Sequence, residues 1–211
     1  VTISRNVVDS FCNQLDDNGG IYTFVNNQTV NKLIYTNRRI DSNFILHSNG
    51  APEGANGTID VAGLYCDDQS LNIRASYNTV AYGKGNGCQL NNPVNISLLY
   101  NTFHDCAGLF ATGLISVNKK PFSNVSGVVI KYNVNYSKNS TQLNFYHGNG
   151  NLTLPPPPMT IAQSLTNLWT MDSNYITNLN ANSYGYLYYA NASSNPTFGS
   201  FNLSTCSFNS I

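Results

Sequence analysis

A motif repeated seven times, a scarcity of charged residues and the lack of helical periodicity predict that this 211-residue chain is a right-handed parallel β-helix. The motif reads apolar, any, apolar, any, any, Asn, any and usually apolar, which fits a strand, a turn and a second strand. Only 9% of residues are charged. Aromatic and β-branched residues are frequent, and no stretch keeps an apolar period of about 3.6 residues. We therefore expect an all-β solenoid of about seven coils with inserted loops.

The copies of the motif define the expected register of the coils. Parallel strands lie about 4.8 Å apart, so the same residue at the same turn should stack into a ladder of bonded amides. Asparagine also tolerates the left-handed backbone of a sharp turn. The slots of this ladder are Asn6, Asn37, Asn78, Asn101, Asn133, Asn174 and Cys206. The slots expected to point inward are Ile3, Ile34, Ala75, Leu98, Ile130, Met171 and Leu203. A β-sandwich is the alternative fold, but it has no reason to repeat one pattern.

A second apolar strand follows in each coil, and two of these strands carry cysteines. Cys66 and Cys88 lie 22 residues apart, which is about one bare coil, so we expect them to be stacked neighbours. The five cysteines include no CxxC pair and no spacing typical of metal ligands. They are best interpreted as buried structural thiols, with any pairing left open.

The spacing of the copies also predicts loops and domain organisation. The long steps predict insertions at residues 41–57 and 148–162, the second of which contains four consecutive prolines. Both ends of the chain fall on copies of the motif, with no capping helix between them and the termini, whereas solenoids need capped ends. We expect residues 1–211 to form one β-helix domain, either part of a longer polypeptide or a unit that stacks end to end as a homo-oligomer.

The charge balance excludes several classes of partner. Ten Lys and Arg residues are matched by ten Asp and Glu residues, so the chain lacks the basic stripe of a nucleic-acid-binding or membrane-surface protein. No apolar run approaches the roughly 18 residues of a membrane span. No cofactor motif is present, so we expect no cofactor other than Ca²⁺.

Three segments resemble the pectate-lyase-like superfamily of right-handed parallel β-helices. They are Asp-Asp-Asn-Gly-Gly-Ile-Tyr-Thr at 16–23, Gly-Leu-Tyr-Cys-Asp-Asp at 63–68 and Tyr-Asn-Thr-Phe at 100–103. The likeness covers the first half of the chain well and the second half only through the repeat. It implies the fold, and a place among polysaccharide lyases, glycoside hydrolases, epimerases, phage tailspikes and non-catalytic adhesins. Fold alone does not choose among these activities.

Two pairs of adjacent aspartates flank the strands that carry this resemblance. Asp16 and Asp17 precede the first strand, and Asp67 and Asp68 follow the second. Stacked coils could bring Asp17, Asp67 and Asp68 to one groove, where two carboxyls would act as acid and as nucleophile or base on a glycosidic bond. The same oxygens could instead bind Ca²⁺. A third interpretation is that the aspartates only cap their own turns.

Further candidates lie in the predicted 41–57 insertion and just before it. Glu53 could supply a catalytic acid from a loop above the groove, with His47 binding substrate beside it, or both could be solvated. Arg38 and Arg39 form the only adjacent arginine pair and could bind a sugar carboxylate, or could simply be solvated. The pair His104–Asp105 and His147 are weaker candidates for a base.

Sequons for N-glycosylation are frequent, although a chain so rich in Asn, Ser and Thr produces many by chance. They occur at Asn27, Asn56, Asn95, Asn124, Asn135, Asn139, Asn151, Asn191 and Asn202. They agree with an extracellular or surface-exposed protein. The expected function is that of an extracellular carbohydrate-active β-helix, a glycoside hydrolase or tailspike-like depolymerase that binds a polysaccharide. The alternative is a non-catalytic structural or adhesive solenoid, such as a fibre segment or glycosylated surface protein.

Overall fold

The structure is a computed structural model that describes residues 1–15, 17–25, 35–51, 61–68, 70–106, 115–119, 127–137, 143–147, 169–178, 186–191 and 194–200. Across these ranges the chain is all-β, with strands β1 to β19 and no helix. Accordingly, this part of the chain offers no helical segment with the length and apolar character needed to cross a bilayer.

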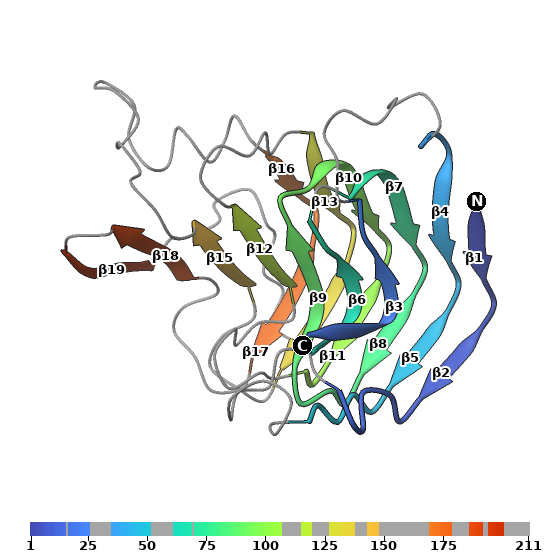
Figure 1. Ribbon diagram of the computed structural model, residues 1–211. Coiled ribbons are helices and arrows are strands. Elements are labelled where there is room, and N and C mark those ends of the chain that lie inside the picture. Colours follow the sequence, from blue (N-terminus) through green and yellow to red (C-terminus); the bar gives the residue numbers. More distant parts are fainter. Residues whose placement is uncertain are drawn as a thin grey trace.

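The strands form three sheets, here called A, B and C, which the chain visits in turn (Figure 1). Sheet A contains β1 (Thr2–Ser4), β4 (Arg38–Asp41), β7 (Leu71–Ser76), β10 (Val94–Leu99), β13 (Val128–Lys131) and β16 (Trp169–Asp172). Sheet B contains β2 (Val7–Asp9), β5 (Phe44–Leu46), β8 (Thr79–Ala81), β11 (Thr102–His104), β14 (Val134–Ser137) and β17 (Tyr175–Asn178). Sheet C contains β3 (Asn18–Thr23), β6 (Val61–Cys66), β9 (Asn86–Asn91), β12 (Ile115–Lys119), β15 (Leu143–His147), β18 (Tyr186–Asn191) and β19 (Ser194–Ser200).

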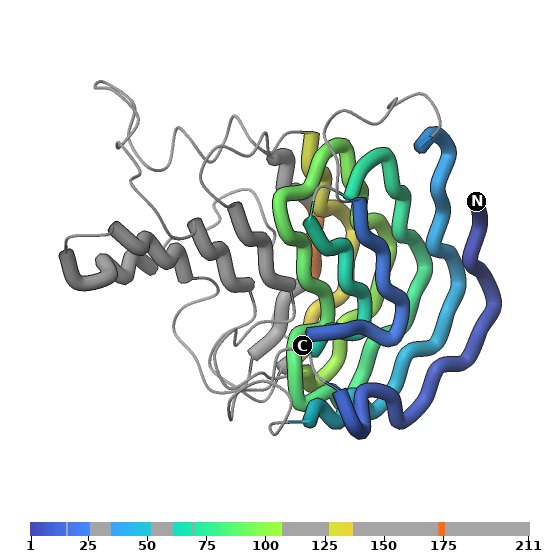
Figure 2. Tube along the Cα trace, in the orientation of Figure 1, coloured from blue at the N-terminus to red at the C-terminus, as the bar shows by residue number. Residues whose placement is uncertain are grey.

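Nearly all neighbouring strands pair in parallel, as predicted. Each strand of sheets A and B pairs with the strand three elements away in the chain, so successive passes lie side by side (Figure 2). Sheet C follows the same rule until its last pair, in which β18 and β19 run antiparallel. The sequence did not predict this antiparallel pair. The last predicted copy of the motif, with Leu203 and Cys206, lies outside the described residues.

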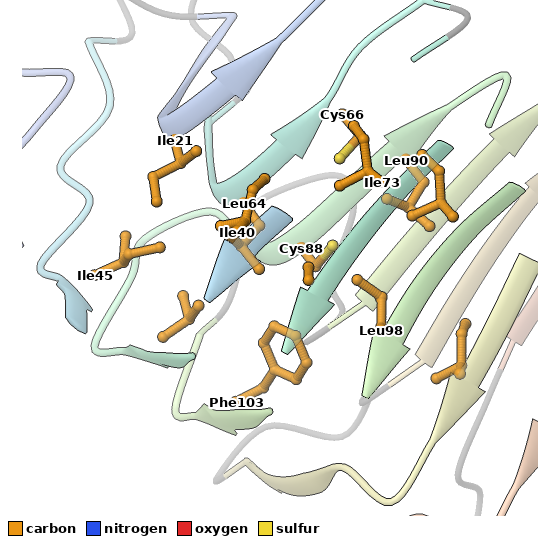
Figure 3. Packing of buried hydrophobic residues seen from close by; sticks show 14 of the residues in the cluster. Ile21, Ile40, Ile45, Leu64, Cys66, Ile73, Cys88, Leu90, Leu98 and Phe103 are labelled. Atoms are coloured by element: carbon orange, nitrogen blue, oxygen red, sulfur yellow. The ribbon is translucent and has the colours of Figure 1, made fainter. Parts of the chain in front are cut away.

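The core lies between the three sheets and is built from the inward residues of each pass. Figure 3 shows side chains of all three sheets in this core. Sheet A contributes Ile40, Ile73 and Leu98, and sheet C contributes Leu64, Cys88 and Leu90. Ile45 and Phe103 come from sheet B. Successive strands place apolar residues in register: Ile3 opposes Ile40, Ala75 opposes Leu98, and Leu98 opposes Ile130. The predicted inward slots are therefore confirmed for Ile3, Ala75, Leu98 and Ile130, although Ile3 is only partly buried. Met171 pairs in register with Ile130.

An asparagine ladder runs along the molecule between sheets A and B. In every rung but the last, Nδ2 donates to the Oδ1 of the next asparagine at 2.8–3.0 Å, and the backbone N–H of the same residue donates to that oxygen as well. Each oxygen after the first rung thus accepts two hydrogen bonds, and the inner rungs are almost completely buried. The rungs are Asn6, Asn43, Asn78, Asn101, Asn133 and Asn174.

The second rung corrects the predicted register. Asn43, not Asn37, bonds Asn6 and Asn78, and Ile40 fills the inward slot assigned to Ile34, which lies outside the described residues. The copy was missed because Arg38 occupies its first apolar slot. The insertion predicted at 41–57 therefore cannot begin at Asp41, since Asp41 ends β4 and residues 44–46 form β5.

The left-handed residue of each turn is also not the one predicted. It is the residue before the asparagine, with φ between 52° and 58°, so the asparagine is free to turn its amide into the ladder. The left-handed region of backbone dihedral angles is unfavourable for residues other than glycine. The residue before the asparagine nevertheless adopts it at every rung. These residues are Arg5, Ser42, Tyr77, Tyr100, Tyr132 and Ser173.

The cysteine register differs from the prediction by two residues. Cys66 opposes Leu90, and Cys88 opposes Leu64, so the two thiols are not opposite neighbours. Both belong to the core, as does Cys106. Burial raises the pKa of Cys66 and Cys106 to about 11 and that of Cys88 well above its ordinary range. These three thiols are structural, as the sequence suggested.

We expect Cys66, Cys88 and Cys106 to resist alkylation by iodoacetamide in the folded protein. The thiolate is the reactive form, and here it is disfavoured by burial and shielded from the reagent. Site-by-site mass spectrometry of tryptic peptides, with a urea-denatured sample as control, would measure this. Equal labelling of these sites in native and denatured protein would contradict the core placement.

Candidate functional site

The outward face of sheet C contains buried polar side chains. Every residue of β6 and β9 is buried, so both faces of these strands are covered, whereas β7 and β10 of sheet A alternate with more exposed positions. Among the covered residues are Asn86, Gln89 and Asn91, and Asn86 donates from Nδ2 to Oε1 of Gln89 at 2.9 Å. Burying a polar side chain is costly unless it is hydrogen-bonded, so several such residues on the outward face of one sheet are unusual.

A hydrogen-bonded network continues from these residues to both aspartate pairs. Tyr65 donates its hydroxyl to Oδ1 of Asp17 at 3.0 Å and accepts from Nδ2 of Asn91 at 2.8 Å. Asn91 also donates to Oδ1 of Asp67 at 2.9 Å, and Tyr22 donates to Oδ2 of Asp67 at 2.6 Å. We call these five residues together with Asp68 the tyrosine–aspartate cluster. The network thus links Asp17 of the first pair to Asp67 of the second through Tyr65 and Asn91, whereas the predicted common groove stays a prediction.

Sheet register explains how the cluster forms. Tyr22 of β3 opposes Tyr65 of β6, and Gln89 of β9 opposes Tyr65 on the other side. The two tyrosine rings meet edge to face, with centroids 5.3 Å apart. Sequence reasoning missed both tyrosines as site residues, although the matching Gly-Ile-Tyr and Gly-Leu-Tyr strands could have aligned them.

Asp67 is the anchor of the cluster. Its side chain is 9% exposed and accepts three hydrogen bonds, from Tyr22, from Asn91 and from the backbone N–H of Asp68 at 2.7 Å. Both carboxylate oxygens are therefore engaged within the protein. We interpret Asp67 as the residue that positions Tyr22, rather than as a proton donor to a substrate.

Tyr22 is held in its neutral form. Burial of its hydroxyl, followed by the hydrogen bond to Asp67, raises its pKa above the ordinary 10.0, and the charges of Asp67, Asp17 and Asp68 add to the rise. Tyr22 as a residue is 40% exposed, and its ring stacks on Phe24 at 6.5 Å between centroids. Tyr22 thus presents an open aromatic surface next to three carboxylates.

The Tyr22→Phe variant should change how stability depends on alkaline pH. Because the pKa of Tyr22 is raised on folding, the neutral phenol contributes stability that is complete below about pH 10 and is lost as pH rises toward the raised value. The wild type should therefore lose stability relative to Tyr22→Phe above pH 10, while their difference stays constant between pH 7 and 9. Urea denaturation across this range measures it, and a constant difference at all pH values would contradict the assignment.

Asp17 and Asp68 are the more accessible carboxylates. Asp17 is exposed and accepts the Tyr65 hydroxyl, whereas Asp68 is half-buried and accepts from Nδ2 of Asn92 at 2.7 Å. An open hollow lies beside this part of the chain and is lined by residues 11–15, Asn18 and Gly19, but by neither of these two carboxylates.

The other predicted site residues do not join the cluster. The side chains of Arg38 and Arg39 point to opposite faces of β4, so they cannot bind one carboxylate together. Arg38 donates to the carbonyl of Leu71 at 3.4 Å, and its guanidinium lies over the ring of Tyr35. His47 pairs through Nδ1 with Asp9 at 2.8 Å, and this hydrogen bond lowers the pKa of Asp9. Glu53 lies outside the described residues.

His104 belongs to an aromatic row on sheet B rather than to a catalytic pair. Its ring stacks on Tyr136, with centroids 4.7 Å apart, and meets the edge of Tyr82 at 5.1 Å. Tyr82 in turn stacks on His47 at 5.6 Å. For His147 the structure places only the backbone, at the end of β15.

Two of the sequon asparagines have described side chains. Asn95 is exposed, with its amide bonded to Asn72 at 3.2 Å. Asn135 is fully buried in the inward slot between Phe103 and Ile176, so the folded chain has no room for a glycan there. Asn191 ends β18. The remaining sequons, at Asn27, Asn56, Asn124, Asn139, Asn151 and Asn202, lie outside the described residues.

No group of three His, Cys, Asp or Glu side chains converges as a metal site within the described ranges, which do not include Asp16. Comparison with known proteins does not assign the chain either. No family model matches the sequence, and no curated protein or solved structure is significantly similar to it.

Proposed function

We propose that the chain is an extracellular, right-handed parallel β-helix of about seven coils that acts on carbohydrate, as a glycoside hydrolase or tailspike-like polysaccharide depolymerase. The observation that supports this most is the network that joins Asp17 to Asp67 through Tyr65 and Asn91. It places several carboxylates beside an open tyrosine ring, which is the combination of groups that glycoside hydrolysis uses.

The proposed roles follow from accessibility. Asp17 and Asp68 serve as the acid–base pair, because Asp67 is buried with both oxygens engaged. Tyr22 stays neutral, offers a ring face for a sugar and is positioned by Asp67. Glu53 remains a predicted third acid.

The test is an assay of the protein against a panel of polysaccharides, in which the release of reducing ends measures depolymerisation. Asp17→Asn and Asp68→Asn should each lower turnover by about 100-fold or more, the range of lost acid–base catalysis, with unfolding midpoints close to wild type. Asp9→Asn is the matched control, because Asp9 is an exposed aspartate outside the cluster. Full activity in both cluster variants would overturn the proposal. Assays with and without EDTA test a requirement for Ca²⁺.

A non-catalytic structural solenoid is the second candidate, and one observation favours it. The asparagines of the ladder bond one another, and the tyrosines of the row stack on one another, without any ligand. This candidate predicts that no polysaccharide of the panel is cleaved and that glycans occur on the accessible sequons.

A further inference from the structure

Two arginines lie next to each other on the outward face of sheet A. Arg39 of β4 and Arg74 of β7 are direct register partners, and both side chains are exposed. On the flanking strands, Thr2 of β1 opposes Arg39 and Ser97 of β10 opposes Arg74, and both of these side chains are short and uncharged. The pairing predicted from sequence joined Arg39 to Arg38, whereas the register joins it to Arg74.

Neither of these arginines forms an ion pair within the described structure. The only ion pair there joins His47 and Asp9. The carboxylate on the same strand, Asp41, accepts instead from the hydroxyls of Ser76 at 2.8 Å and Ser42 at 3.1 Å. Like charges on adjacent strands, about 4.8 Å apart, repel each other, so their juxtaposition in a chain with few charges suits an anion from outside.

A row of exposed tyrosines begins at Tyr77, three residues after Arg74 in the chain. Tyr77, Tyr100 and Tyr132 stack nearly parallel, with centroids 5.2 and 4.9 Å apart, and each is 43–55% exposed. They occupy the turns that follow β7, β10 and β13. In the preceding turn this position is Ser42, which is too small to cover the ring face of Tyr77 that Tyr100 leaves open.

We propose that this face binds an acidic glycan, a polysaccharide bearing carboxylates or sulfates. Arg39 and Arg74 bind the anionic groups through their guanidinium forks, and the open face of Tyr77 receives the apolar side of a sugar ring. Thr2 and Ser97 lie opposite the two arginines on the flanking strands, and their hydroxyls suit the hydroxyls of a sugar. The face lies on sheet A, whereas the tyrosine–aspartate cluster lies on sheet C, so this inference stands whether or not the chain is an enzyme.

The test is binding of full-length protein to alginate and heparin, with dextran as the neutral polymer, measured by isothermal titration calorimetry. The Arg39→Gln/Arg74→Gln variant should lower affinity for an acidic polymer about tenfold or more, as expected for losing charge-assisted hydrogen bonds. Tyr77→Ala should lower it less. Lys84→Gln, which removes an exposed charge after β8, should leave it unchanged. Added salt should weaken wild-type binding.

Three results would overturn the inference. They are equal binding of dextran, wild-type affinity in the double arginine variant, and equally tight binding of poly-glutamate or single-stranded DNA. Binding of alginate alone or heparin alone supports it and identifies the anion. Circular dichroism of the variants checks that the fold is kept, and the Arg39→Lys/Arg74→Lys variant provides a second, charge-preserving comparison that should retain part of the affinity.

Discussion

Replacing Asn101 by Ala should destabilise the protein by about 3–5 kcal/mol, as much as a large cavity in the core. Its side chain is 1% exposed and makes four hydrogen bonds, two as donor to Ala75 and Asn133 and two as acceptor from Asn78. A net hydrogen bond contributes about 1 kcal/mol, and a buried donor left without a partner adds about 1–3 kcal/mol. The backbone N–H of Asn78 would be such a donor.

Urea denaturation measures this loss, and Asn6→Ala is the matched control. Asn6 is exposed at the end of the ladder and has a partner on one side only, so its removal should cost about 1 kcal/mol or less. Similar losses at the two positions would show that burial of the ladder contributes little.

Leu98→Ala should cost about 2–5 kcal/mol through lost burial and the cavity that remains. Leu98 is fully buried between Ala75 and Ile130 of the adjacent strands, and neither neighbour can fill the space without a backbone shift. Leu99→Ala is the control, because Leu99 is half-buried on the other face of the same strand. Thermal and urea unfolding of both variants checks it. A loss at Leu99 equal to that at Leu98 would contradict the assignment of inward and outward faces.

The sequence predicted the parallel strands and most of the ladder because the motif repeats a buried residue and a buried amide at one spacing. The motif failed to identify a copy in which a residue that is not apolar fills an apolar slot. Arg38 masks the copy around Asn43, which bonds the ladder where Asn37 was predicted. The sequence predicted bonded amides at Asn101, and the structure shows that its side chain makes four hydrogen bonds.

The candidate site was predictable only in part. Two aspartate pairs beside similar strands indicated that carboxylates would lie near each other, and one hydrogen-bonded network links Asp17 to Asp67 through Tyr65 and Asn91. Which carboxylate is engaged depends on contacts between strands that lie far apart in the sequence. Asp67 is saturated by Tyr22, Asn91 and a backbone N–H, and no local pattern carries that information. The opposite orientations of Arg38 and Arg39 follow from strand geometry once β4 is located.

The most direct test of the proposed function is a crystal structure of the Asp17→Asn/Asp68→Asn variant soaked with oligosaccharides released by the wild type from its best polysaccharide substrate. We predict sugar within hydrogen-bonding distance of residues 17 and 68, with a ring against Tyr22. Release of no oligosaccharide from any polymer, or ordered glycan attached to sequon asparagines with nothing bound at the tyrosine–aspartate cluster, would contradict the proposal and support the structural solenoid.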